Sequence, residues 1–114
     1  MEHKILKYES KGIRASGYIK PNNAFVILKG SFAIDDTELK DSFLDRPKYA
    51  IKRRELIGTG KLKKRIHDYQ FTEDVEFDSP SLAAIIIWGC RLNGRKVFGI
   101  EEDSQNEIPI DDLI

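Results

Sequence analysis

Two stretches of the sequence carry side chains that could act in catalysis, and both have a simpler explanation. Ser79-Pro80-Ser81 offers two hydroxyl groups, but no histidine lies near them in the sequence, and helix capping accounts for Ser79. Asp35-Asp36, followed by Glu38-Leu39-Lys40, fits the acid-x-Lys pattern of some nucleases. Such a triplet also arises by chance in a chain of which 33% is charged. We therefore predict that the protein is not an enzyme.

Metal and phosphate sites are not indicated either. His3, His67 and Cys90 have no spacing that is typical of metal ligands. Gly58-Thr59-Gly60 is too short for a phosphate-binding loop, and it follows a predicted helix, whereas such loops precede one. The sequence therefore predicts no metal and no cofactor.

The feature that remains is an uneven distribution of charge. The chain has 19 basic and 19 acidic residues, yet residues 46–65 contain nine Lys or Arg and a single acid, Glu55. This segment therefore carries +8 and the remainder −8, with six acids and no Lys or Arg in residues 101–114. Such a polarised distribution matters more for binding than the net charge of zero.

Two interpretations of the basic segment stay open. Its side chains could solvate a helix face and keep a hairpin from edge pairing. They could instead contact phosphate groups, because a basic helix followed by a hairpin resembles a winged-helix layout. In that case four of them form one basic face, opposed by an acidic face built largely from residues 101–114. These four are Lys52, Arg54, Lys63 and Arg65. The residues predicted to bind nucleic acid are Lys48, Lys52, Arg54, Lys61, Lys63 and Arg65.

The first predicted helix begins at Pro47 and runs to about Ile57. Its apolar stripe is formed by Tyr49, Ala50, Leu56 and Ile57. Arg53 falls within this stripe, so we expect its guanidinium to be buried. A buried guanidinium needs a partner, and the candidates are Asp74 and Glu76.

The second helix is predicted to be the centre of the core. Ser79 caps its first turn, Pro80 suits the first helical position, and Gly89 ends it. Residues 82–88 are apolar on every side, which is typical of a helix inside a core. At roughly 13 Å it is too short to span a bilayer, and we expect no membrane association. The residues predicted to be structural are Arg53, Phe71, Ser79, Pro80, Ile85, Trp88, Gly89, Asn93 and Gly94.

Alternating or apolar segments predict the first strands, which are residues 4–8, 12–20, 24–28 and 32–34. A hairpin follows at 61–71, and its two-residue turn, His67-Asp68, sets Ile66 opposite Tyr69. Asn93-Gly94 predicts a second tight turn, and residues 107–114 suit only an edge strand.

These elements make a single domain, 1–114, of the α+β class. We expect a small antiparallel sheet and hairpins packed around one buried short helix, plus a second basic amphipathic helix. Cys90 is the only cysteine and the first residues contain no apolar run, so the expected location is the cytoplasm.

Several blocks of sequence, taken in order, resemble one family. They are Lys11-Gly12-Ile13-Arg14-Ala15-Ser16-Gly17, Phe25-Val26-Ile27-Leu28-Lys29-Gly30-Ser31, Arg53, Leu56-Ile57, Gly60, Phe71-Thr72-Glu73-Asp74, Phe77 to Ala84, and Asn93-Gly94. Together they resemble the family catalogued as domain of unknown function 4357, over residues 8–100, which leaves 101–114 as an acidic tail. Phe98 stands where the family often has Trp, and Asp78 where Ser is usual. Both are changes at the level of packing.

The resemblance implies an accessory domain. Such domains often follow nuclease or restriction-type domains, and they resemble a module associated with DNA-modification enzymes. The partners that the resemblance implies are DNA or RNA, or a nuclease or methylase protein. No activity is assigned to the family itself. The alternative is a protein–protein interaction or oligomerisation module that does not bind nucleic acid.

Overall fold

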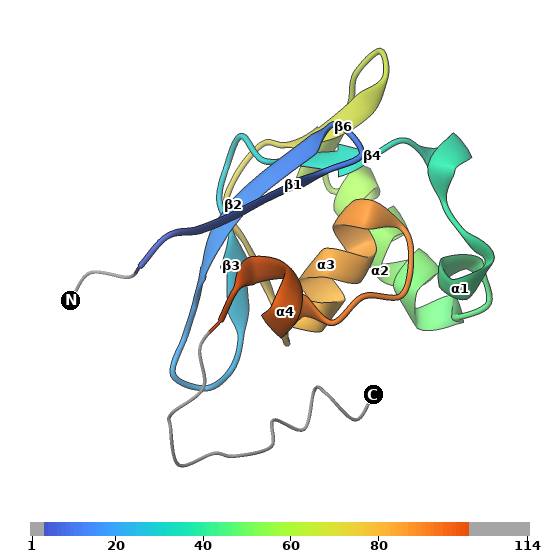
Figure 1. Cartoon of the computed structure of the whole chain (residues 1–114). Coiled ribbons are helices and arrows are strands. Elements are labelled where there is room, and N and C mark those ends of the chain that lie inside the picture. The colour runs from blue at the N-terminus through green and yellow to red at the C-terminus, as the bar shows by residue number, and fades with distance from the viewer. Residues whose placement is uncertain (1–3, 101–114) are drawn as a thin grey trace.

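The computed structural model describes residues 4–100, in which short strands and helices alternate (Figure 1). The strands are β1 (Leu6–Ser10), β2 (Ile13–Ile19), β3 (Phe25–Ile27), β4 (Phe32–Ile34), β5 (Leu62–Lys64), β6 (Asp68–Phe71) and β7 (Val75–Phe77). The helices are the 3-10 turn η1 (Asp36–Glu38), α1 (Asp41–Leu44), α2 (Pro47–Gly58), α3 (Pro80–Trp88) and α4 (Gly94–Phe98). The predicted α+β class is confirmed.

The strands form two antiparallel sheets. The first has the order β1-β2-β3-β7 and the second the order β4-β6-β5. Strand β7, which has only three residues and was not predicted, pairs with β3 so that Phe77 lies opposite Phe25. Gly17 lets β2 and β3 pack closely, because a Cβ there would lie 2.2 Å from the carbonyl oxygen of Val26.

Helix α3 has the ends and the burial that the sequence predicts. The hydroxyl of Ser79 accepts a hydrogen bond from the backbone N–H of Leu82 at 3.1 Å, and Pro80 occupies the first turn. Gly89 ends the helix with a φ of 65°, in the left-handed region where a side chain is disfavoured. Ile85 and Trp88 are 5% and 1% exposed. The helix therefore lies inside the core, as expected.

The helices gather on one side of the strands (Figure 1). Helix α3 contacts strands β2, β3 and β7 of the first sheet, β4 of the second, and the helices α2 and α4. Helix α2 packs on α3 and on β5, and it buries Arg53 and Leu56. The basic helix is thus anchored by one face and presents the others to solvent.

The β5–β6 hairpin forms where it is predicted, but in another register. Leu62 pairs with Phe71 and Lys64 with Tyr69, so the predicted pairing of Ile66 with Tyr69 is wrong. The backbone N–H of Arg65 donates to the carbonyl of Asp68 at 2.7 Å, and the turn therefore falls one residue earlier than predicted. This register places Leu62 and Phe71 opposite each other in the core, where both are 1% exposed.

Asn93-Gly94 begins a helix instead of joining two strands. The side chain of Asn93 accepts hydrogen bonds from the backbone N–H groups of Arg95 and Lys96, which caps α4. Asn is a good residue at both a tight turn and a helix cap, so the dipeptide alone does not separate the two. The predicted second hairpin is therefore wrong.

The predicted strand at 107–114 and the acidic face at 101–114 lie outside the described residues. Within residues 4–100, no helix has the length and apolar character needed to cross a bilayer.

Candidate functional site

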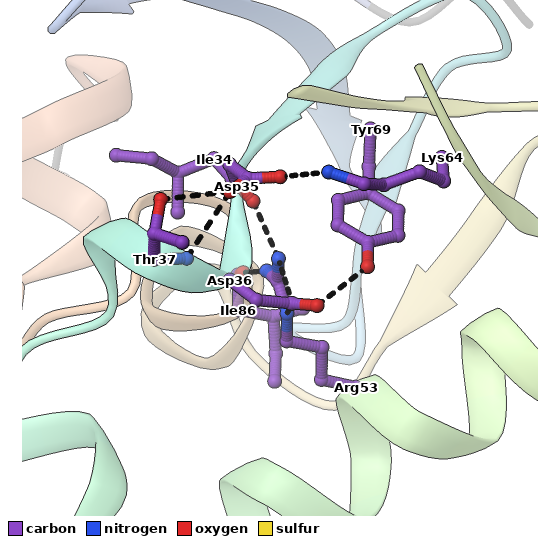
Figure 2. A network of polar contacts seen from close by, with 8 residues as sticks. All are labelled: Ile34, Asp35, Asp36, Thr37, Arg53, Lys64, Tyr69 and Ile86. Atoms are coloured by element: carbon purple, nitrogen blue, oxygen red, sulfur yellow. Dashed lines mark hydrogen bonds and ion pairs between the residues drawn. The ribbon is translucent and has the colours of Figure 1, made fainter. Parts of the chain in front are cut away.

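Arg53 is the centre of a polar network that holds α2 in place (Figure 2). Its side chain is 3% exposed, as predicted, but its acidic partner is Asp36, whose Oδ1 lies 3.1 Å from Nη2. The predicted partners Asp74 and Glu76 are wrong. Asp74 accepts from the backbone N–H of Lys29, and Glu76 pairs with Lys20.

Two backbone carbonyls complete the guanidinium's partners. Nη1 donates to the carbonyl of Ile86 at 2.9 Å, and Nη2 donates to the carbonyl of Ile34. Ile86 lies in the last turn of α3, where carbonyls lack partners within the helix and a cation is favoured. Arg53 therefore caps α3 and ties it to the end of β4 and to α2.

Asp36, whose side chain is 55% exposed, links the buried Tyr69 to the same network. The hydroxyl of Tyr69 donates to Asp36 Oδ2 at 2.7 Å, and the Arg53 guanidinium lies 4.9 Å from the centre of the Tyr69 ring. The pKa of Tyr69 is raised to about 12. Burial is the largest cause, and the hydrogen bond to Asp36 and the negative charge of the Asp36 carboxylate act in the same direction.

We expect this phenol to ionise later than an ordinary tyrosine. Because folding raises the pKa of Tyr69, the protonated phenol stabilises the folded state. This contribution to the free energy of unfolding is complete below pH ~10 and is lost as the pH rises from about 10 to about 12. The absorbance of phenolate, titrated in the wild type and in Tyr69→Phe, measures this. The difference between the two curves should rise with a midpoint near pH 12. A midpoint near the ordinary value of about 10 would contradict the assignment.

A second ion pair extends the network to the hairpin. Lys64 of β5 donates to the carboxylate of Asp35, which also accepts from the backbone N–H and the hydroxyl of Thr37. The ammonium of Lys64, and then the two groups of Thr37, lower the pKa of Asp35 far below its ordinary value. Lys64 therefore has a partner within the network, whereas Lys61 and Lys63 form no ion pair with a carboxylate of residues 4–100.

We use the name hairpin surface for four basic residues of α2 and of the β5 strand that packs on it, with the flanks of that strand. They are Arg54, Lys61, Lys63 and Arg65. Lys63 lies opposite the neutral Gln70, away from the buried side chains of Leu62 and Phe71. Arg65 pairs with Asp68 at 3.1 Å and lies 4.8 Å from the ring centre of Phe32. The hairpin itself projects beyond the rest of the fold (Figure 1).

The six residues predicted to bind nucleic acid fall into two groups. Residues 52 and 54 are separated by about 200° around an α-helix, so Lys52 and Arg54 lie on different sides of α2. Lys48 and Lys52 line a groove beside α3, and none of the hairpin surface lines it. The single basic face expected from the sequence is therefore divided between two surfaces.

This groove lies between α2 and the start of α3 and has a volume of about 890 Å³. Residues of α1, of α2 and of the connection from α3 to α4 form its walls. They are Ser42, Arg46, Lys48, Tyr49, Ile51, Lys52, Glu55, Asp78, Ser79, Ser81, Leu82, Ile85, Arg91, Leu92 and Asn93.

Hydrogen bonds from backbone N–H groups fix the wall formed by residues 91–93. The N–H of Arg91 donates to the hydroxyl of Ser42 at 3.1 Å, which attaches this connection to α1. The N–H of Gly94 donates to the hydroxyl of Ser81 at 2.9 Å. Gly94 lies so close to α3 that a Cβ there would be 2.1 Å from the carbonyl carbon of Pro80. The start of α3 and the start of α4 therefore set the shape of the groove together.

Sequence reasoning missed several members of these sites. Asp36 was one of many acids in an irregular connection, and no local pattern assigned it to Arg53. Arg46 was counted in the basic segment and Arg91 was not, and nothing in the sequence placed them in one groove. Only the packing of α1, α2 and α3 brings them together.

The comparisons with known proteins identify a family. The model of the domain of unknown function DUF4357 matches residues 6–106. No curated protein and no solved structure shows a significant match to this chain. Two blocks that carried the resemblance, Phe77 to Ala84 and Asn93-Gly94, meet in the contact of Gly94 with Pro80 and Ser81. Because the match covers most of the 114 residues, the chain belongs to the DUF4357 family.

Proposed function

We propose that this chain is a non-catalytic, cytoplasmic accessory domain that binds nucleic acid weakly through the hairpin surface. The observation that supports this most is that three of its four basic residues lack a counter-charge. Arg54, Lys61 and Lys63 form no ion pair with any carboxylate of residues 4–100. Basic side chains that are left uncompensated on a projecting hairpin suit a partner with regularly spaced negative charges.

The expected mode of binding is contact with phosphate groups. Such contacts position a protein on nucleic acid without reading its bases, so little sequence preference is expected. Arg65 contributes a guanidinium that is already held by Asp68 and Phe32. A nuclease or restriction-modification enzyme is the setting in which we propose that this accessory domain acts.

Fluorescence anisotropy with a short labelled duplex and a single strand of the same length tests the proposal. Four phosphate contacts predict a slope of log affinity against log salt between about −3 and −4 on duplex DNA, measured from about 50 to about 200 mM salt. The variant Lys61→Glu/Lys63→Glu should lose most of the binding, because each substitution replaces an attraction to phosphate by a repulsion. Neither residue has an ion pair in residues 4–100, so the far-UV circular dichroism should stay native.

The matched control is Lys48→Glu/Lys52→Glu, which changes the net charge equally but lies in the groove. It should keep most of the affinity. If both double variants lose binding to the same extent, the affinity depends on the net charge of the protein and not on the hairpin surface. If the wild type binds neither nucleic acid at about 50 mM salt, the proposed function is wrong.

A further inference from the structure

The groove beside α2 carries positive charge that the described residues do not neutralise. Arg46, Lys48 and Arg91 line it, and none of them forms an ion pair with a carboxylate in residues 4–100. Among the described residues, the one carboxylate that pairs with Lys52 is that of Glu55, at 3.8 Å and about one turn away on the same helix. An exposed pair of this kind contributes little, so the rim attracts anions.

The floor of the same groove is apolar. Tyr49, Leu82 and Leu92 are partly exposed along it, and Ile85 also lines it, at 5% exposure. Ile51 stands at the rim with 59% of its surface exposed. A ligand that covers these side chains gains the free energy of removing them from water. The groove therefore combines a basic rim with an apolar floor.

Nucleic acid fits this combination poorly. Phosphate groups would contact the basic rim but leave the apolar floor uncovered. A second copy of the groove fits poorly as well. A twofold interface places the same patch of both copies together, which would bring the basic rims face to face.

We propose that the groove binds an acidic segment of a protein partner, one that carries apolar side chains beside its carboxylates. The apolar side chains pack on Tyr49, Leu82 and Leu92. The carboxylates pair with Arg46 and Arg91, whose planar guanidinium groups can hold a carboxylate through two hydrogen bonds. This interaction is separate from nucleic-acid binding, because the hairpin surface contributes no residue to the groove.

The test is a titration of the full chain with fluorescein-labelled peptides followed by anisotropy. The probe alternates pairs of glutamate with pairs of leucine. One control replaces each glutamate by glutamine, and the other replaces each leucine by alanine. The probe should bind with a micromolar dissociation constant, and each control should bind at least about tenfold more weakly, since each removes one half of the recognition.

A charge-reversal variant locates the binding on the molecule. Arg46→Glu/Arg91→Glu should weaken binding of the glutamate–leucine probe at least about tenfold and should allow binding of a matching lysine–leucine peptide. Lys61→Glu/Lys63→Glu, which has the same net charge, should bind the original probe like the wild type. The exchange of peptide preference is the readout that a merely misfolded variant would not give.

Four outcomes would overturn the proposal. Equal binding of all three peptides would show that the chemistry of the groove does not select its ligand. Displacement of the probe by short duplex DNA would assign the groove to nucleic acid. A dimer in light scattering that the Arg46→Glu/Arg91→Glu variant abolishes would assign it to a second copy. Much tighter binding of a peptide with the sequence of residues 101–114 would assign it to this chain's own acidic segment.

Discussion

Replacing Arg53 by methionine is expected to lower the free energy of unfolding by about 3–5 kcal/mol, because two buried carbonyls lose the group that donates to them. The largest part of this loss comes from the carbonyls of Ile34 and Ile86. Both residues are buried, and each carbonyl loses the guanidinium that donates to it. An unsatisfied buried acceptor costs about 1–3 kcal/mol. Asp36 contributes less, because its side chain is 55% exposed and water can replace its partner.

Urea denaturation followed by far-UV circular dichroism measures this change. The neighbouring residue provides a matched control, since Arg54 is exposed and has no ion pair within residues 4–100. Arg54→Met should change the free energy of unfolding by less than about 0.5 kcal/mol. Arg53→Lys should recover only part of the loss, because a single ammonium cannot reach two carbonyls and Asp36 as a planar fork does. Equal stability of the Arg53→Met and Arg54→Met variants would refute the role of the network.

Trp88→Ala is expected to lower the free energy of unfolding by about 3–5 kcal/mol, through lost apolar burial and the cavity that remains. Trp88 is 1% exposed and connects three elements. Its ring meets Tyr8 of β1 edge to face at 5.1 Å between centres, and it lies 6.0 Å from the ring of Phe98 in α4. Its indole N–H donates to the carbonyl of Ser10 at 3.0 Å.

Trp88→Phe separates packing from hydrogen bonding. It keeps most of the apolar volume and loses the donor to Ser10, so a loss of about 1–2 kcal/mol is expected. Trp88 is the only tryptophan, and the unfolding must therefore be followed by circular dichroism and not by its fluorescence. A Trp88→Ala variant within about 1 kcal/mol of the wild type would show that α3 is not the centre of the core.

Local sequence was enough to predict α3, and the reason is chemical. The first turn of the helix is capped by Ser79 and begins with Pro80, and its last turn ends at Gly89. These interactions are made within a few residues and do not depend on the rest of the fold. The burial of Arg53 was predicted from its place in the apolar stripe for a similar reason. Its partner was not, because Asp36 is 17 residues away and meets it only after β4 and α2 have packed.

Local sequence predicts the structure poorly where a segment can form either of two favourable local structures. The β5–β6 turn could start at either of two positions, and the burial of Leu62 against Phe71 decided it. Asn93 could begin a turn or a helix, and the contact of Gly94 with Ser81 favours the helix. The groove had no local signal, since its basic rim joins the start of α2, with Arg46 and Lys48, to Arg91, which follows α3.

The position of the hairpin turn has a consequence for how the length of this chain can vary. Ile66, at 85% exposure, contributes almost nothing to the core, so residues could be inserted or removed at the tip without disturbing it. The segment from Ser81 to Gly94 is different, because its two ends are bonded to each other and any change of length would separate them. Variation in length at the tip would therefore alter how far the β5–β6 hairpin projects, while the groove keeps its shape.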